Sequence, residues 1–226
     1  MLQEFATPPE IKMKTLDQYL SNGWYRMGPT IFTTDFLFYE GEFCLVIWLR
    51  YRLSDYNISK SYRKLQKLNK SFTYEVRPFQ INEDYERLYQ KYILTMPPGR
   101  VSSLSELLYG NLQQNVYDSF VVNLFDGNKL IGVGIFDLGE KSAAGIATFY
   151  DPDYKKHSPG RYIIFSKISY CMQHGFEFFY PGYVVAGVKA FDYKLGLGGN
   201  SVEFYDWKEK DWKILDDVTK SYLLNS

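Results

Sequence analysis

Residues 148–194 read TFYDPDYKKHSPGRYIIFSKISYCMQHGFEFFYPGYVVAGVKAFDYK, and this stretch decides the predicted fold. A strand rich in small and aromatic residues ends at Tyr150, and a polar, basic loop follows it. Ser158 is a typical N-cap for a helix that we expect over Pro159–Gln173, because proline is favoured at the first helical position. A second strand, Glu177–Tyr180, is expected to end at the Pro-Gly pair that follows. The stretch therefore predicts a strand, loop, helix and strand unit.

Upstream of this unit the sequence predicts a strand, two helices and an antiparallel meander of three strands. The strands of the meander are separated by turn-forming pairs such as Asp126-Gly127. Downstream we expect a short helix and a last strand. In chain order these elements are Phe72–Gln80, Asn82–Leu94, Ser103–Leu112, Phe120–Phe125, Lys129–Asp137, Ala143–Tyr150, Val188–Leu195 and Ser201–Asp206.

The first part of the chain has a different pattern. Phe36–Tyr39 and Phe43–Leu53 are rich in aromatic and branched residues on either side of a Glu-Gly-Glu turn, which indicates a hairpin. Helical spacing then begins near Asn57 and lasts to about residue 70. We expect an N-terminal subdomain over residues 1–70, with a hairpin and a basic helix, and a larger domain over residues 71–226.

Composition limits the classes of protein that this chain fits. It has 226 residues, 46% of them hydrophobic, which is enough for a substantial core, and its formal net charge is zero. A general nucleic-acid binder usually carries an overall basic field, so any nucleic-acid contact would need a local patch. The two cysteines cannot form a disulfide framework or a four-ligand metal site. No segment has the apolar length of a membrane span, and we expect a cytoplasmic protein without membrane contact.

The element order from Phe72 onward resembles that of the GNAT-type acyltransferases. The resemblance implies an α+β fold in which helices flank a central, mostly antiparallel sheet, and the acyl donor enters where the fourth and fifth strands splay apart. Members that use CoA hold its pyrophosphate on backbone N–H groups of a glycine-rich loop. The equivalent loop, Tyr154–Arg161, has one glycine and contains Pro159, which has no N–H. Each missing donor costs about 1–3 kcal/mol, so CoA is disfavoured.

A more specific resemblance lies in the motifs of the opening stretch. Tyr150-Asp151-Pro152-Asp153, Ser158-x-Gly160, Tyr180-Pro181-Gly182-Tyr183 and Tyr193-Lys194 are similar to the C-terminal signature of the aminoacyl-tRNA–protein transferases of the N-degron pathway. Prolines stand here at two positions where that family has leucine. A weaker match upstream is Tyr56-x-x-Ser59-x-x-x-Arg63-Lys64. The N-terminal cysteine cluster of the family is absent, so a metal or iron–sulfur role for it is not expected.

The resemblance implies an enzyme that moves arginine or leucine from charged tRNA to the N-terminal α-amine of a protein. Its partners would be charged tRNA and protein N-termini. No cofactor is expected, because the donor is already an activated ester. One alternative is a GNAT N-acyltransferase that uses acyl-CoA, and another is a non-catalytic binding module on the same fold.

The candidate site residues follow from these motifs. As catalytic residues we expect Asp151, which would orient or deprotonate the amine, together with Tyr150 and Tyr183, which would relay a proton or bind the ester. Local turn formation is the alternative role for Asp151, and closure of the core is the alternative for the tyrosines. The residues expected to bind the substrates are Tyr180, Gly182, Tyr193 and Lys194. The residues expected to bind tRNA or its phosphates are Lys60, Arg63, Lys64, Lys67, Lys156, Gly160 and Arg161.

Overall fold

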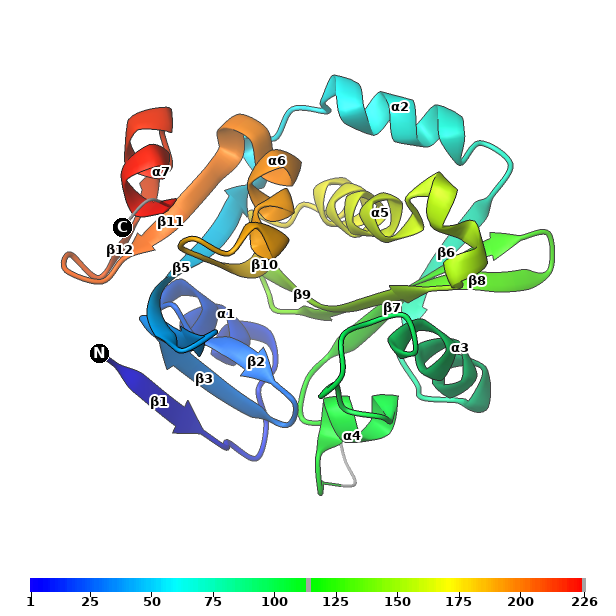
Figure 1. The fold of residues 1–226 in the computed structure, drawn as a ribbon, viewed down its shortest axis with the longest axis horizontal. Coiled ribbons are helices and arrows are strands. Elements are labelled where there is room, and N and C mark those ends of the chain that lie inside the picture. The colour runs from blue at the N-terminus through cyan, green and yellow to red at the C-terminus, as the bar shows by residue number, and fades with distance from the viewer. Residues whose placement is uncertain (113–114, 225–226) are drawn as a thin grey trace.

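The meander expected from the sequence forms one half of a larger mixed sheet (Figure 1). In the computed structural model β7 (Ser119–Asp126), β8 (Lys129–Leu138) and β9 (Ser142–Tyr150) run antiparallel, and β6 (Thr73–Pro78) adds to β7 at the edge. The structure describes residues 1–112 and 115–224. The sheet order is β12-β11-β5-β10-β9-β8-β7-β6, and β4 pairs with β5. The other strands of this sheet are β4 (Phe36–Tyr39), β5 (Glu42–Arg52), β10 (Phe178–Val185), β11 (Val202–Asp206) and β12 (Asp211–Ile214).

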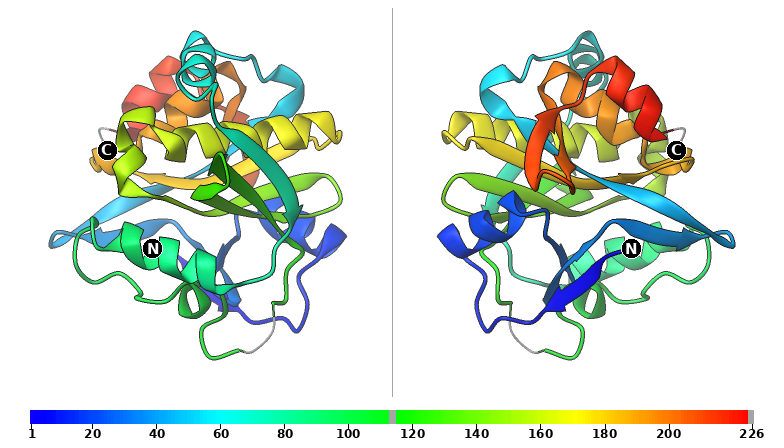
Figure 2. Two further views of the ribbon diagram at one scale, coloured as in Figure 1. Left: turned by 90° about the vertical axis from the view of Figure 1, so that its right-hand side faces the viewer. Right: turned by 90° about the vertical axis from the view of Figure 1, so that its left-hand side faces the viewer.

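Helices cover both faces of the meander (Figures 1 and 2). α5 (Pro159–Gln173) packs on β8 and β9 from one side, and α3 (Glu83–Ile93) packs on the same strands from the other. A Cβ atom on Gly134 of β8 would lie 2.1 Å from the side chain of Ile163, so glycine allows α5 to approach the sheet closely. The remaining helices are α1 (Met13–Ser21), α2 (Lys60–Leu68), α4 (Leu104–Tyr109), α6 (Tyr193–Gly198) and α7 (Asp217–Leu224).

The junction of β9 and β10 is the irregular part of the sheet. These two strands are parallel and pair only from Phe178 to Tyr180, opposite Ser142 to Ala144. The sequence prediction that the next Pro-Gly pair ends the strand was wrong. β10 continues to Val185, with a shift of register against β5 between Phe179 and Gly182. The pair is tolerated because proline and a glycine with φ of +90° suit an irregularity in a strand rather than a regular ladder.

The predicted hairpin is confirmed by the pairing of β4 with β5. The sequence did not reveal how this hairpin is placed in the sheet. β5 pairs with both β10 and β11, so it lies inside the main sheet. The division into residues 1–70 and 71–226 remains a prediction. Residues 1–70 nonetheless contribute a central strand, β5, to the sheet that is formed mainly by residues 71–226. A small separate sheet of order β1-β3-β2 is formed by β1 (Gln3–Ala6), β2 (Tyr25–Met27) and β3 (Thr30–Thr34).

Two further details differ from the sequence prediction. Ser158 precedes α5 but has φ of +52°, and its side chain makes no capping hydrogen bond. A short 3-10 helix, Pro152–His157, comes before it and determines how the chain enters α5. β12 and α7 also follow the strand that was expected to be the last. Within the described ranges, the search for a helix of the length and hydropathy of a membrane span finds none.

A buried ion pair joins the small sheet to the large one. Arg26 of β2 donates from Nη1 to Asp137 Oδ1 of β8 over 2.9 Å, and both side chains are almost inaccessible to solvent. The same guanidinium group donates to the carbonyl of Leu108, and Ser119 Oγ donates to Asp137. Each charge is therefore hydrogen-bonded on several sides.

We predict that Arg26→Met lowers the free energy of unfolding by about 3–5 kcal/mol, because it leaves the Asp137 carboxylate buried without its partner. Urea denaturation monitored by circular dichroism measures this loss. Asp137→Leu added to Arg26→Met is expected to restore part of the stability. The exposed pair Lys141–Glu177 provides the control, since Lys141→Met should leave the midpoint almost unchanged. A midpoint for Arg26→Met equal to that of the wild type would contradict the prediction.

Candidate active site

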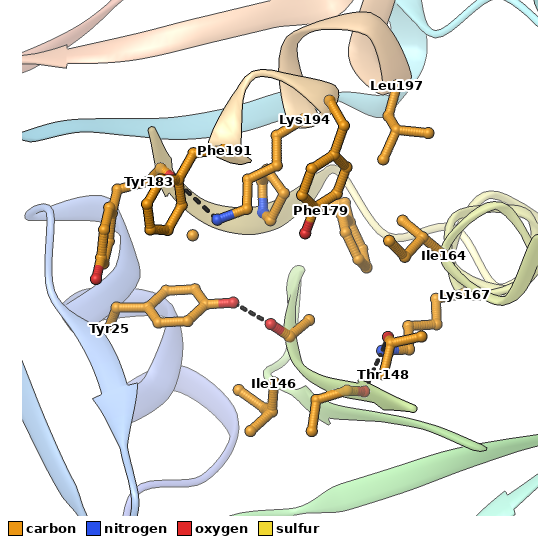
Figure 3. A pocket seen from close by; sticks show the side chains of 15 residues that line it. Tyr25, Ile146, Thr148, Ile164, Lys167, Phe179, Tyr183, Phe191, Lys194 and Leu197 are labelled. Carbon is orange, nitrogen blue, oxygen red and sulfur yellow. Dashed lines mark hydrogen bonds between the residues drawn. The ribbon is translucent and has the colours of Figure 1, made fainter. Parts of the chain in front are cut away.

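A cavity of about 250 Å³ opens where β9 and β10 separate (Figure 3). One wall is the segment Gly145–Thr148 of β9, and the opposite wall is formed by β10 on both sides of its irregularity. α5 closes one end, and the segment around α6 covers the top. Because the two strands stop pairing after Tyr180, no ladder hydrogen bonds fill the space between them.

One part of the cavity is apolar. The side chains of five residues from β9, α5, β10 and α6 line it: Ile146, Ala147, Ile164, Phe179 and Leu197. Among the described residues that line the cavity there is no carboxylate. The charged groups of the lining are two ammonium groups, which belong to Lys194 and Lys167.

Lys194 reaches the cavity from α6. Its Nζ donates to the backbone carbonyl of Tyr183 over 2.6 Å and lies 5.3 Å and 5.2 Å from the ring centres of Tyr183 and Phe191. Burial lowers the pKa of Lys194 to about 8. Gly182 lies beside this group, and a Cβ atom there would be in ordinary van der Waals contact with Nζ at 3.5 Å. Among residues 1–112 and 115–224 the carbonyl of Tyr183 is its one hydrogen-bond acceptor, which leaves two N–H bonds of the ammonium group for a ligand.

Lys167 enters from the middle of α5 and is 1% exposed. Its Nζ donates to the carbonyls of Ile135 and Ala147, each over 2.9 Å, and to Thr148 Oγ1 over 3.0 Å. Burial lowers the pKa of Lys167 to about 7. All three N–H bonds of the ammonium group therefore have acceptors within the protein.

The tyrosine hydroxyls of the cavity are hydrogen-bond donors rather than bases. Tyr25 donates its hydroxyl to the carbonyl of Gly145. Burial raises the pKa of Tyr25, Tyr183 and Tyr193, so each stays protonated near neutral pH. The ring of Tyr183 lies between Trp48, which it meets edge-on, and Phe191, on which it stacks.

The structure brings together four of the predicted site residues. Gly182, Tyr183, Tyr193 and Lys194 all line the cavity. Tyr180 does not line it, and its ring packs against Trp212 and Phe178 instead.

Tyr150 and Asp151 also lie outside the cavity lining. Tyr150 packs against Tyr92 of α3. The Asp151 carboxylate forms ion pairs with Lys91 over 2.5 Å and Lys129 over 2.9 Å, and it accepts the backbone N–H of Asp153. Burial alone would raise the pKa of Asp151, but these hydrogen bonds together lower it to about 2. The geometry fits the alternative role as a turn and helix-capping residue, and a carboxylate this acidic is a poor acceptor for an amine proton.

Two titratable residues of the cavity lining were missed by sequence reasoning. Tyr25 belongs to a strand of the small sheet that had no separate prediction. The position of Lys167 could have been noticed in the sequence. It lies four residues after Ile163 and four before Cys171, both of which are buried, so helical spacing places it on the buried face of α5. A lysine on the buried stripe of a helix is rare and indicates a special role.

The predicted phosphate-binding residues form a separate basic surface. Lys60, Arg63, Lys64 and Lys67 are exposed on α2, and Lys156 and Arg161 are exposed at the start of α5. Two hydrogen bonds hold these segments together: Asn69 Nδ2 donates to the His157 carbonyl over 3.0 Å, and His157 Nδ1 lies 3.2 Å from the Leu68 carbonyl. Gly160 is half-buried beside the ring of Tyr150. No group of three or more potential metal-ligating side chains occurs in residues 1–112 and 115–224.

Comparisons with solved structures find similar chains at low sequence identity. The C-terminal domain of a putative lysylphosphatidylglycerol synthetase from Agrobacterium fabrum superposes with a TM-score of 0.50 at 14% identity, over 70% of this chain and 52% of that one. The ribosomal-protein-S18-alanine N-acetyltransferase of Escherichia coli gives a TM-score of 0.34 at 17% identity, over 46% of this chain and 62% of that one. The predicted α+β architecture, in which helices flank a mostly antiparallel sheet, is confirmed.

Sequence comparisons are more specific. An aspartate/glutamate leucyltransferase from Vibrio cholerae is 28% identical over 205 residues, which cover 86% of this chain and 83% of that protein. Leucyltransferases of the same description from Leptospira interrogans and Acinetobacter baumannii are 27% and 30% identical, over 98% and 81% of this chain and 86% and 68% of those proteins. The model of the arginine-tRNA-protein transferase C-terminus matches residues 83–202. This chain therefore belongs to that family, and it is an aminoacyl-tRNA–protein transferase.

Proposed function

We propose that this enzyme transfers leucine from charged tRNA to the α-amine of proteins that begin with aspartate or glutamate. The observation that supports leucine over arginine is the character of the cavity. Its apolar part suits a branched aliphatic side chain, and its two ammonium groups would repel a guanidinium group that finds no carboxylate among the lining residues. The names of the three leucyltransferase relatives agree with this choice of donor and acceptor.

Lys194 supports the choice of an acidic acceptor. Its ammonium group has free N–H bonds and lies in a half-buried, aromatic environment, where a charge-assisted hydrogen bond to a carboxylate is stronger than in water. In our proposal the acceptor's side-chain carboxylate binds Lys194, and its α-amine then faces the ester of the donor. Tyr183 and Tyr193 line the same region and supply hydroxyl donors.

The proposed chemistry is aminolysis of an ester. The acceptor nitrogen forms a bond to the ester carbonyl carbon, the bond from that carbon to the ribose oxygen breaks, and a proton from the amine ends on the departing ribose oxygen. An α-amine has a pKa near 8, so a useful fraction is neutral at pH 7. The protein needs to align the two substrates and stabilise the tetrahedral oxyanion. The proposal includes no cofactor, and the cytoplasm, where charged tRNA is made, is the proposed compartment.

The start of α5 argues against the alternative that uses acyl-CoA. Pro159 has no N–H to donate, and Ser158 has a left-handed backbone with no side-chain cap. The basic surface of α2 and the start of α5 is instead our candidate for contacts to the tRNA backbone. Phosphate contacts of this kind add affinity without reading the base sequence, and they weaken as salt rises.

We predict at least 100-fold faster transfer of leucine than of arginine to a peptide that begins with aspartate, because the cavity disfavours a buried guanidinium group. Mass spectrometry after incubation with total charged tRNA measures both products. Leu197→Trp, which fills the apolar part, should reduce leucine transfer strongly. Predominant arginine addition would refute the choice of donor, and acylation from acyl-CoA would instead favour the alternative enzyme class.

We predict that Lys194→Met raises KM for an aspartyl peptide by about tenfold or more, since a charge-assisted hydrogen bond contributes about 1.5–3 kcal/mol. The wild-type KM should also rise with pH above about 8, because the ammonium form of Lys194, which binds the carboxylate, is present below its pKa of about 8. Steady-state kinetics between pH 6.5 and 9.5 test both effects. Lys208→Met, in the exposed turn between β11 and β12, is the control. An unchanged KM for the Lys194 variant would exclude this contact.

We predict that Lys64→Glu together with Lys67→Glu greatly weakens tRNA binding, because both changes replace a cation that would neutralise a phosphate. The slope of log affinity against log salt should fall by about 1 for each lysine that binds a phosphate in the wild type. Filter binding at several salt concentrations measures both quantities. Lys208→Glu with Lys210→Glu makes the same charge change in the turn between β11 and β12, which lies away from α2 (Figure 1). Equal reductions of affinity in both double variants would mean that net charge, not this surface, governs binding.

A further inference from the structure

The wall of the cavity that belongs to β9 is not a regular strand. Ile135 of β8 pairs with Ala147, and Phe136 pairs with Gly145, so Ile146 is an extra residue on β9. This is the geometry of a β-bulge, which redirects the backbone and needs extra support to stay in one conformation. The bulged segment Gly145–Thr148 lines the cavity throughout its length.

Lys167 supports this bulge from the side of α5. Its three acceptors are the carbonyls of Ile135 and Ala147, which are the cross-strand pair at the edge of the bulge, and the hydroxyl of Thr148. Figure 3 shows Lys167 beside Thr148. One ammonium group thus connects the bulged strand to its neighbour. Gly134 makes the contact possible, because a Cβ atom there would lie 2.6 Å from Lys167 Cε.

A lysine is an unusual residue at a position that is 1% exposed. A buried ammonium group is costly, and no ion pair of Lys167 occurs in the part of the chain that the structure describes. The carboxylate of Asp137 on β8 acts on it only through its field, and Cys171 is the titratable neighbour on α5. A methionine of the same length would fill the space between α5 and the sheet, but the carbonyls of Ile135 and Ala147 would lose this donor. Buried charged groups retained at the wall of a cleft are candidates for function.

We propose that Lys167 is a positioning residue for aminoacyl transfer, which fixes the bulged segment of β9 against the donor ester. The inference rests on the proposed use of this cavity for the transfer reaction. Preorganised donors and charges around an oxyanion act mainly on the transition state. A displacement of about 1 Å at such a site reduces the rate by about 100-fold. The effect should therefore appear in kcat and not in KM.

The test compares Lys167→Met, Thr148→Val and Ser166→Ala with the wild-type enzyme. Thr148→Val removes one of the three acceptors and keeps the charge. Ser166→Ala is the matched control, because Ser166 is the buried neighbour on α5 and, within the described part of the chain, its hydroxyl bonds to the Tyr162 carbonyl of its own helix alone. Transfer of leucine to an aspartyl peptide gives kcat and KM for both substrates, and circular dichroism gives the folded fraction by which kcat is corrected.

We expect Lys167→Met to lower the corrected kcat by about 100-fold and Thr148→Val by about fivefold, with KM values within about twofold of the wild type, and Ser166→Ala to keep its rate. A folded Lys167→Met enzyme with wild-type kcat overturns the inference, as does a loss of stability with no loss of corrected kcat. If Lys167→Met does not fold, an unchanged kcat in Thr148→Val overturns it.

The proposed function fails in a different way. A wild-type protein without leucine transfer refutes the choice of substrate, and full activity of the cavity-filling Leu197→Trp enzyme refutes the cavity as the site. The Lys167→Met experiment measures a change of kcat relative to an active wild-type enzyme. A failure of the positioning role is therefore distinct from a failure of the proposed function.

Discussion

The short parallel pairing of β9 with β10 is the constraint on which the site depends. Three residue pairs hold the two strands together, and Pro181 and Gly182 then interrupt the ladder. Proline has no N–H to continue the hydrogen bonding, and the positive φ of Gly182 turns the backbone away. β10 stays in the sheet because β5 pairs with it on its other side. The sheet can therefore separate at one point without losing its continuity, and the cavity opens there.

The charges of the protein are distributed unevenly around this opening. Lys167 and Lys194 line the cavity, whereas Asp151 lies outside it between two lysine side chains. The reaction begins with an activated ester and an amine that is partly neutral at pH 7, so it needs stabilisation of negative charge more than it needs a strong base. A site with ammonium groups and protonated tyrosines fits this requirement. The same charges suit an acidic acceptor and disfavour an arginyl donor.

Local sequence patterns predicted most elements well. Asn82 and Ser103 cap their helices as expected, and the meander follows the alternation and turn signals of the sequence. The failures share one cause, which is that tertiary contacts overrode the local preference. Pro181-Gly182 is a typical strand end by local pattern, but pairing with β5 continues the strand. Ser158 is a typical N-cap by local pattern, but the preceding 3-10 helix changes its backbone conformation. β5 itself gave no local sign that it lies within the main sheet.

The sequence by itself determined the element order, the basic face of α2 and the motifs of the transferase family, because each of these depends on residue types at short spacings. Only the tertiary structure decided which motif residues meet. The register shift of β10 between Phe179 and Gly182 interrupts the usual alternation of faces, so Tyr180 packs against Trp212 while Gly182 and Tyr183 line the cavity. The bulge of β9 and its contact with Lys167 of α5 join residues about twenty or more positions apart in the chain. Such contacts arise from the packing of a helix on a sheet, which no local pattern specifies.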